Sequence, residues 1–315
     1  MKQHTLTGFE KYGKTTRRAQ FLADMDKIIP WPELAAAVQT VYPKVSENGG
    51  LPPIPLERML RIYFLQLWFN LSDPAVEEAL YDSVAMRAFV GIELGVDSAP
   101  DETTVCKFRH LLERNKLEVL LRAVNDHLRR SGIKIAKGTI VDATIIGAPS
   151  STKNKDAERD PEMHQTAKGQ QWYFGMKAHV GVDSKTKLIH TVLASSANVH
   201  DREALPYLLH GAETRVWGDQ GYHGQAHLIH RRAPRAKDFT NKRYRFNGQV
   251  NEAEKAKNRN KSRVRAKVEH VFGVIKNIFG FRKVRYRGLA KNLHRLEVTA
   301  ALTNLYMVRR RLLNA

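Results

Sequence analysis

The first 130 residues carry apolar side chains at the spacing of amphipathic helices. In the first such segment, residues 16–29, Leu22 and Met25 fall on one helical face. Pro30 ends this segment because proline cannot continue a helix. The same pattern predicts further helices at residues 33–41, 56–67, 83–90, 102–112 and 116–130, and one that begins at Asp73–Pro74. We therefore predict an all-helical N-terminal domain over residues 1–130.

The short helices between residues 74 and 112 leave two interpretations open. They are compatible with a helix-turn-helix, which would place one helix in a major groove of DNA. They are equally compatible with a helix pair that only packs, because a motif of this kind does not by itself define a function.

After Gly132 the pattern changes from helices to a mixture of strands and helices. Strands are expected at residues 139–146, 174–182, 187–194 and 215–218, and helices at residues 201–209 and 224–231. A polar loop is expected at residues 150–171, and a long basic connection leads to a last pair of helices. This order indicates a mixed α/β core, so residues 131–315 are predicted to form a second domain with a basic insertion around residues 231–262.

The strand at residues 139–146 holds one aspartate, Asp142, among β-branched residues. A carboxylate in an apolar interior costs several kcal/mol unless it is compensated, and a metal ion would compensate it. The alternative is an aspartate that caps a turn at the end of the strand, since perturbed carboxylates also occur for structural reasons.

A second aspartate, Asp219, follows the strand at residues 215–218 and lies between Gly218 and Gly221. In open α/β sheets ligands gather at the carboxyl ends of strands, and glycine lets a backbone or a phosphate approach closely. A plain Asp-x-Gly turn explains the same residues without a ligand.

The third candidate is Glu269, on one of the last helices. Projected at 100° per residue, the apolar residues of this helix fall within an arc of about 120°. They are Val264, Val268, Val271, Phe272, Ile275, Ile278 and Phe279. Arg265, Glu269 and Lys276 form a narrow strip beside that arc. The alternative interpretation of the strip is a surface ion pair between Arg265 and Glu269, which would contribute only a few tenths of a kcal/mol.

Positive charge is concentrated in one segment of the chain. The formal net charge is +20 and the pI is about 10.0. Between Arg231 and Arg287 there are 19 Lys or Arg against 4 Asp or Glu, a net charge of +15. A charge of this size indicates a polyanionic partner, either nucleic acid or an anionic membrane surface, and its concentration in one segment indicates a localised binding surface.

Other features argue against a membrane. The most apolar stretch, residues 62–71, has about half of the length that a membrane-spanning helix needs. Residues 1–14 contain no apolar core of a signal peptide. Cys106 is the only cysteine, so no internal disulfide is available, which fits a reducing cytoplasm.

Four motifs then resemble those of one family. Val-Asp142-Ala-Thr, Asn198-Val-His-Asp201, Gly-Asp219-Gln-Gly-Tyr222 and the run Arg265-x3-Glu269-x6-Lys276 are similar to motifs of bacterial insertion-sequence transposases of the Asp-Asp-Glu (DDE) class, in the insertion-sequence-five group. The resemblance extends over nearly the whole chain. It departs at Ser262, where the family commonly has a tyrosine three residues before the arginine, which puts in doubt a stacking or phosphate contact by that tyrosine.

The resemblance implies a fold, a site and a reaction. The fold is a ribonuclease-H-like core, and Asp142, Asp219 and Glu269 are the catalytic and metal-binding residues. These oxygen ligands suit two Mg²⁺ or Mn²⁺ ions, which serve in-line phosphoryl transfer. The reaction is hydrolysis of a phosphodiester at each inverted-repeat end, followed by attack of the freed 3′-hydroxyl on target DNA. Arg265 and Lys276 are implied to contact DNA near the element end.

Partners and further candidate residues follow from the same family and from the basic segment. Candidate DNA contacts in the basic segment also include Arg243, Arg245, Arg263 and Lys267. Pairing of two element ends suggests a homodimer, in a bacterial cytoplasm and associated with the nucleoid when DNA is bound. Two other functions stay open: a catalytically silent DNA-binding protein or regulator, and a nuclease of the same core without joining activity.

Three remaining groups of residues have ordinary explanations as well as functional ones. Tyr222 is expected to pack rather than to act as a nucleophile, because no activating base accompanies it. His223, His227 and His230 lack the cysteine or histidine partners of a zinc site. The aromatic run at residues 172–174 is expected to belong to the core or a sheet edge rather than to a base-stacking platform.

Overall fold

The computed structural model describes residues 14–44, 52–114, 119–155 and 157–314. The N-terminal part of this description is entirely helical, as predicted. Its helices are α1 (Arg17–Ile28), α2 (Trp31–Gln39), α3 (Leu56–Phe69), α4 (Asp73–Asp82), α5 (Val84–Val90), α6 (Glu102–Arg114) and α7 (Val119–Arg130). Side-chain caps begin several of them: Thr16 Oγ1 accepts a hydrogen bond from the Ala19 amide, and Ser72 Oγ accepts one from the Ala75 amide. The helix expected from residue 116 is described only from Val119, since residues 115–118 lie outside the described ranges.

The second part of the chain contains a six-stranded mixed sheet. Its strands are β1 (Gly138–Gly147), β2 (His164–Lys168), β3 (Gln171–Asp183), β4 (Ile189–Ser196), β5 (Arg215–Trp217) and β6 (Lys237–Asp238). The main path is β2-β3-β1-β5-β6, and β4 pairs with β3. β1 and β4 run antiparallel to β3, whereas β5 runs parallel to β1 and β6 parallel to β5. All four predicted strands are therefore present, in one sheet.

Two expectations for this part were incomplete. The stretch expected to be a polar loop at residues 150–171 contains β2, whose side chains are mostly exposed, so no apolar alternation marks it. The helix expected at residues 201–209 is only α8 (Asp201–Ala204), followed by the 3₁₀ turn η1 (Leu205–Tyr207). Pro206 accounts for the short helix, because it cannot donate the hydrogen bond that would continue it.

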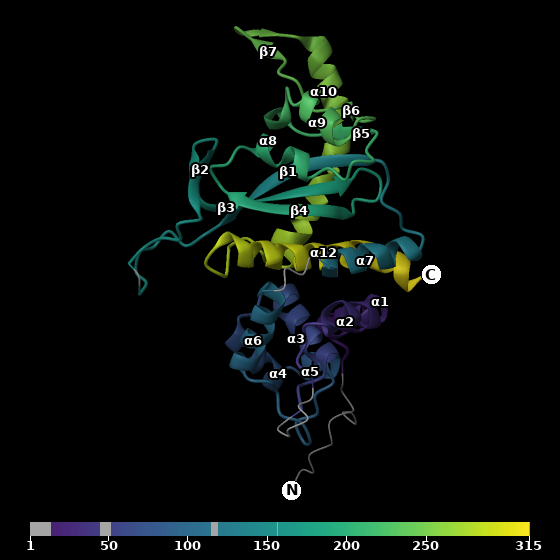
Figure 1. Ribbon diagram of the computed structural model, residues 1–315, viewed down its shortest axis with the longest axis vertical. Helices are drawn as coiled ribbons and strands as arrows, with labels where there is room; N and C mark the ends of the chain where they lie inside the picture. The colour runs from purple at the N-terminus through teal and green to yellow at the C-terminus, as the bar shows by residue number, and fades with distance from the viewer. Residues whose placement is uncertain (1–13, 45–51, 115–118, 156, 315) are drawn as a thin grey trace.

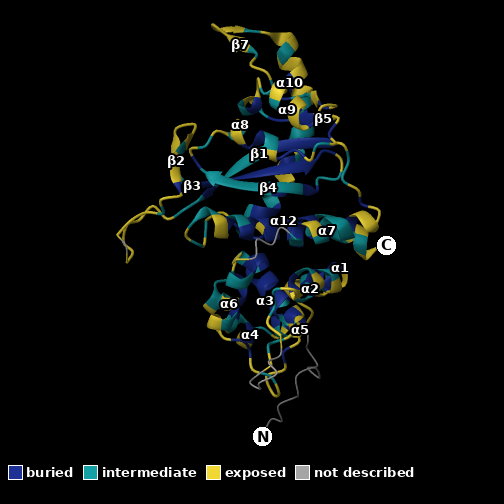
Figure 2. Ribbon diagram, in the orientation of Figure 1, coloured by how far each residue is buried: buried dark blue, intermediate teal, exposed yellow. Residues whose placement is uncertain are grey.

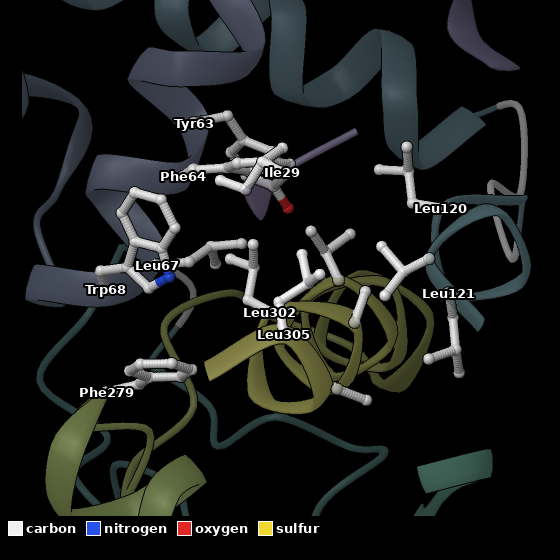
Figure 3. Close-up of a cluster of buried hydrophobic side chains, with 14 of the residues drawn as sticks. Ile29, Tyr63, Phe64, Leu67, Trp68, Leu120, Leu121, Phe279, Leu302 and Leu305 are labelled. Atoms are coloured by element: carbon white, nitrogen blue, oxygen red, sulfur yellow. The ribbon is translucent and has the colours of Figure 1, made fainter. Parts of the chain in front are cut away.

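The last helix, α12 (Leu289–Leu313), lies between the sheet and the N-terminal helices (Figure 1). It contacts β4 and α7 as well as α1, α3 and α6. Its central turns are buried on all sides, including Leu296, Leu302 and Leu305 (Figure 2). Figure 3 shows Leu302 and Leu305 directed toward the aromatic side chains of α3. Because its central turns have no exposed face, α12 lies at the centre of the fold and joins the two parts of the chain into one core.

Polar groups fix the position of α12 against the sheet. Asn304 Oδ1 accepts a hydrogen bond from the Ile189 amide at 2.8 Å, and Asn304 Nδ2 donates to the Ile189 carbonyl at 2.8 Å. Asn304 Nδ2 also donates to Asn125 Oδ1 of α7. Because Asn304 is fully buried, these bonds satisfy groups that would otherwise be costly, and they set the register between α12, β4 and α7. The domain boundary at residue 130 stays a prediction.

The basic connection forms an arm that projects from the sheet (Figure 1). After α9 (Ala226–Arg232), the arm consists of a hairpin, β7 (Arg245–Phe246) and β8 (Gln249–Val250), and the helix α10 (Glu252–Arg265). The single helix expected around residues 264–279 is divided into α11 (Lys267–Gly273) and a π-helical turn, η3 (Val274–Ile278). As a result Ile278, expected in the apolar arc, is 49% exposed. No helix among the described residues is long and apolar enough to cross a membrane.

We predict that Leu302→Ala lowers the free energy of unfolding by about 2–5 kcal/mol, the usual cost of removing a fully buried leucine side chain. The measurement is urea denaturation followed by circular dichroism. The matched control is Leu313→Ala at the end of the same helix, where the side chain is 36% exposed and the expected cost is much smaller. Equal losses for the two variants would contradict the central role of α12.

Candidate active site

Two neighbouring parallel strands bring Asp142 and Asp219 together. In the pairing of β1 with β5, Ile140 lies opposite Trp217. Asp142 lies two residues after Ile140, and Asp219 lies two residues after Trp217, so the two aspartates occupy corresponding positions relative to the two strands. Adjacent strands in a sheet are about 4.8 Å apart. The two carboxylates, which are 77 positions apart in the sequence, therefore meet at the carboxyl end of β5.

The environment of Asp142 opposes its ionisation. Burial, the largest effect, raises the pKa of Asp142 to about 6, and the negative charges of Asp219 and Asp201 act in the same direction. A hydrogen bond of 2.8 Å from the Ala143 amide and the positive charge of Arg265 act against the rise. Asp142 is thus a partly buried carboxyl group among like charges, and a bound cation would stabilise its ionised form.

Asp219 has a structural contact in addition to its place beside Asp142. Its Oδ1 atom accepts a hydrogen bond from the Gly221 amide at 2.8 Å and so begins the 3₁₀ turn η2 (Gln220–Tyr222). Gly218 gives the Tyr222 ring room, because a Cβ atom at that position would lie 3.0 Å from the ring and would make the ring shift. The turn that was the alternative explanation for Asp219 therefore exists, and it leaves Oδ2 available to a ligand.

Asp201, for which we proposed no role from the sequence, is a third acid near this pair. It occupies the first position of α8, and its Oδ1 atom forms an ion pair of 2.9 Å with Lys177 Nζ on β3. Its charge raises the pKa of both Asp142 and Tyr222. The motif Asn198-Val-His-Asp201 was the only signal in the sequence that pointed to this residue.

Tyr222 is fully buried, as a packing residue should be. Burial raises its pKa well above the usual range, and Asp201, Asp142 and Asp219 raise it further. Its hydroxyl oxygen has no hydrogen-bond partner within the described part of the protein. A phenolate is disfavoured in these surroundings, which argues against a nucleophilic tyrosine.

Glu269 lies on α11 with its side chain exposed to solvent. It forms no ion pair with Arg265, and Ala266 separates α10, which ends at Arg265, from α11. Arg265 lines a cavity of about 710 Å³ together with Asp219, whereas Glu269 lines two other cavities. In the described ranges, no three His, Cys, Asp or Glu side chains lie close enough together to hold a metal ion.

Helix α11, which carries Glu269, contacts β1. Arg265, just before α11, acts on Asp142, and Lys276, just after it, donates hydrogen bonds to Thr144 Oγ1 at 3.1 Å and to the Ile145 carbonyl at 2.9 Å. Glu269 lies between these two residues in the chain, four residues or about 6 Å of helix from Arg265.

The other candidate DNA contacts differ in how far they are engaged within the protein. Lys267 Nζ donates to the Ser184 carbonyl at 2.6 Å, and Arg243 Nε donates to the Arg245 carbonyl in the hairpin. The side chains of Arg263 and Arg245 are exposed. Ser262, which replaces the family tyrosine, accepts a hydrogen bond from Asn241 Nδ2 at 3.1 Å and lines the cavity that contains Asp219.

The histidines and the aromatic run have different outcomes. Among the residues that the structure describes, His223, His227 and His230 belong to no group that could hold a metal. Trp172 is not part of the core, since 70% of its side chain is exposed at the outer end of β3. Phe174 packs against the core, as expected, and Tyr173 lines a cavity.

Two family models match the chain. The Transposase DDE domain matches residues 134–305, and the Transposase domain (DUF772) matches residues 10–111. Since the first match alone covers more than half of the 315 residues, the chain belongs to the transposases with a DDE domain. The predicted fold class, a ribonuclease-H-like mixed sheet behind an all-helical N-terminal region, is confirmed. Membership of the insertion-sequence-five group stays a prediction.

The chain is also similar to a solved structure, the piggyBac transposase in a synaptic complex with hairpin DNA, determined by cryo-electron microscopy. The two chains are 12% identical with a TM-score of 0.44, and the match covers 93% of this chain and 73% of the other.

We predict that Arg265→Gln raises the pKa of Asp142 above its value of about 6, since the arginine charge favours the ionised carboxylate. The pKa can be measured by carbon NMR of the protein with labelled aspartate, without divalent metal. Lys276→Gln is the matched control, because Lys276 is not one of the main charges that act on Asp142. An unchanged pKa in Arg265→Gln would contradict the contact between α10 and the aspartates.

Proposed function

We propose that this transposase cleaves phosphodiester bonds at the inverted-repeat ends of an insertion sequence and joins the freed 3′-hydroxyl to target DNA. The observation that carries the proposal is the meeting of Asp142 and Asp219 at neighbouring strand ends, beside an arginine and at the base of a basic arm. Buried acids of this kind are costly for stability and are typical of sites that bind cations.

Asp142, Asp219 and Glu269 would hold the metal ions of this site. The donors fit hard divalent cations, because all are carboxylate oxygens and the charges of Asp219 and Asp201 add to the burial that disfavours ionised Asp142. Two Mg²⁺ or Mn²⁺ ions would supply an activated nucleophilic oxygen and stabilise the leaving oxygen of an in-line displacement. Glu269 completes the set only after its side chain turns inward, so we expect the site to close when DNA and cations are bound.

Arg265 and Lys276 have distinct tasks in this proposal. Arg265 lies beside Asp142 and Asp219, where it offsets part of their repulsion in the absence of cations and contacts a phosphate of the element end in their presence. Lys276 uses two of its three N–H groups on Thr144 and Ile145, and the third remains for a phosphate oxygen.

The projecting arm supplies the larger DNA-binding surface. Its hairpin exposes Arg243 and Arg245, and α10 carries further basic residues, with Arg263 exposed near its end. Lys267 holds the loop between β3 and β4 and contributes to DNA binding through its charge alone. Since cleavage occurs at two ends that are brought together, we expect two copies of the chain to act as a homodimer on paired ends.

We predict that Asp142→Asn abolishes cleavage and joining but leaves DNA binding intact. The amide keeps the shape of the side chain and removes the charge that a cation needs. The measurement is strand cleavage and joining on a duplex that carries the element's terminal repeat, with Mg²⁺ or Mn²⁺, together with binding of the same duplex. The matched control is Asp126→Asn on α7, which removes one carboxylate far from the site in sequence and leaves it intact.

The same experiment separates the alternative functions. Cleavage without joining by the wild type would identify a nuclease. Binding without cleavage under any divalent metal would identify a catalytically silent DNA-binding protein, and the metal-site proposal would then be wrong.

We predict that Arg243→Gln/Arg245→Gln weakens DNA binding and makes it less dependent on salt. Each lost phosphate contact reduces the slope of log K against log salt by about 0.9, so the double variant should lose about 1.8. The matched control is Arg129→Gln/Arg130→Gln on α7, which removes the same charge outside the arm. Equal changes in both variants would show that overall charge, and not the arm, governs binding.

A further inference from the structure

A separate cavity of about 570 Å³ lies between the end of β1, the outer part of β3 and the helix that carries Glu269. Its lining includes Tyr173 and Phe272, the cations Lys276, Arg282 and Lys283, and Glu269 itself. We propose that this cavity binds one unpaired nucleotide of the DNA strand at the site of cleavage, with the base against the aromatic rings and a phosphate against the cations. The inference rests on the proposed function, because it concerns DNA held beside the same carboxylates.

The sheet topology places Tyr173, one of the two aromatic residues of this cavity, beyond the end of β1. The last pair of β1 with β3 is Gly147 with Gly175, and from there β3 continues outward in a hairpin with β2. Tyr173 belongs to this hairpin, opposite Thr166, and its hydroxyl donates to Gln171 Oε1 at 2.7 Å. The hydrogen bond restricts the ring to one orientation, which lowers the entropy that stacking of a base would cost.

Three cations also line the cavity. The Lys276 ammonium group donates hydrogen bonds to Thr144 Oγ1 and to the Ile145 carbonyl. Arg282 is oriented by hydrogen bonds to the Lys276 carbonyl and to Asn277 Oδ1. Lys283 makes no side-chain hydrogen bond or ion pair with any residue in the described part of the chain. Like charges gathered in this way favour an anion between them, and the phosphate of a nucleotide is the anion that this protein's substrate provides.

An unpaired nucleotide fits better than a base pair. Both faces of a base within a duplex are covered by its neighbours, so the rings of Tyr173 and Phe272 could reach only a base that has left the stack. Stacking on aromatic side chains accepts any base, since every base has a π face. The cavity also lies within the range of volumes that is typical of small-molecule sites.

The neighbouring residue Trp172 offers a matched comparison. It lies on the same hairpin as Tyr173, and successive side chains of a strand point to opposite faces. Trp172 does not line the cavity, and 70% of its side chain is exposed. Replacing Trp172 therefore removes an aromatic ring from the hairpin without altering the cavity.

The test compares three DNAs by fluorescence anisotropy without divalent metal: a blunt duplex, the same duplex with a short single-stranded overhang, and the same overhang built from abasic nucleotides. The abasic overhang keeps every phosphate and lacks only the bases. We expect the wild type to bind the natural overhang about tenfold more tightly than the abasic one, a difference of about 1.4 kcal/mol and within the range for stacking of one base. Tyr173→Ala should lose this preference, whereas Tyr173→Phe and Trp172→Ala should keep it.

Binding of the blunt duplex shows that each variant is folded and separates the two proposals. Equal binding of natural and abasic overhangs by the wild type, with the blunt duplex still bound, would overturn the nucleotide site and leave the transposase proposal standing. Loss of the preference in Trp172→Ala as well as in Tyr173→Ala would also overturn it, because the hairpin and not the cavity would then be responsible. Failure to bind any of the three DNAs would overturn both proposals.

Discussion

The burial of α12 is the constraint on which the rest of the structure depends. The central turns of the helix have no exposed face, and the sheet and the N-terminal helices cover them from opposite directions. Apolar packing alone would allow α12 to slide along its neighbours. The hydrogen bonds of Asn304 to Ile189 and Asn125 fix one register between α12, β4 and α7. With β4 held in place, β3 and β1 follow through their ladders, and the position of Asp142 follows from β1.

The candidate active site places acidic side chains at the end of the sheet that α12 holds in position, where a protein core would ordinarily have apolar ones. The ionised form of Asp142 is disfavoured by burial and by the charges of Asp219 and Asp201, and the hydrogen bond from the Ala143 amide and the charge of Arg265 offset part of this effect. Such an arrangement stores unfavourable electrostatic energy in the folded protein. The surrounding packing must supply the stability that keeps the carboxylates together, and a substrate with its cations would release the repulsion on binding.

Much of the fold followed from local patterns. The helical segments before residue 130 and all four predicted strands are present, because apolar periodicity and capping residues act over a few positions. Asp142 and Asp219 could also be picked out, since Asp142 lies within a short apolar run and Asp219 follows the end of another. Strand β2 could not be found in the same way, because its stability comes from pairing with β3 rather than from burial of its own side chains.

The helix that carries Glu269 shows a second limit. Its residues fit a continuous helix at 100° per residue, yet the chain leaves that path at Ala266 and again in the π turn at Val274–Ile278. Both changes respond to contacts distant in sequence, such as those of Lys276 with β1, which no local pattern contains. The role of Asp201 was missed for a similar reason: its influence on Asp142 exists only after α8 folds beside the sheet.

Gly175 gives the structure a particular evolutionary freedom. It lies where β3 passes the end of β1, and a Cβ atom there would come within 2.1 Å of the Ile146 carbonyl oxygen, so no other residue fits without separating the strands. Beyond this point the hairpin of β2 and β3 carries mostly exposed side chains, whose replacement has little effect on stability. With glycine kept at this one position, the outer hairpin can change in sequence while the strands that position the carboxylates stay the same. Changes in the hairpin would then alter DNA preference without altering the carboxylate site.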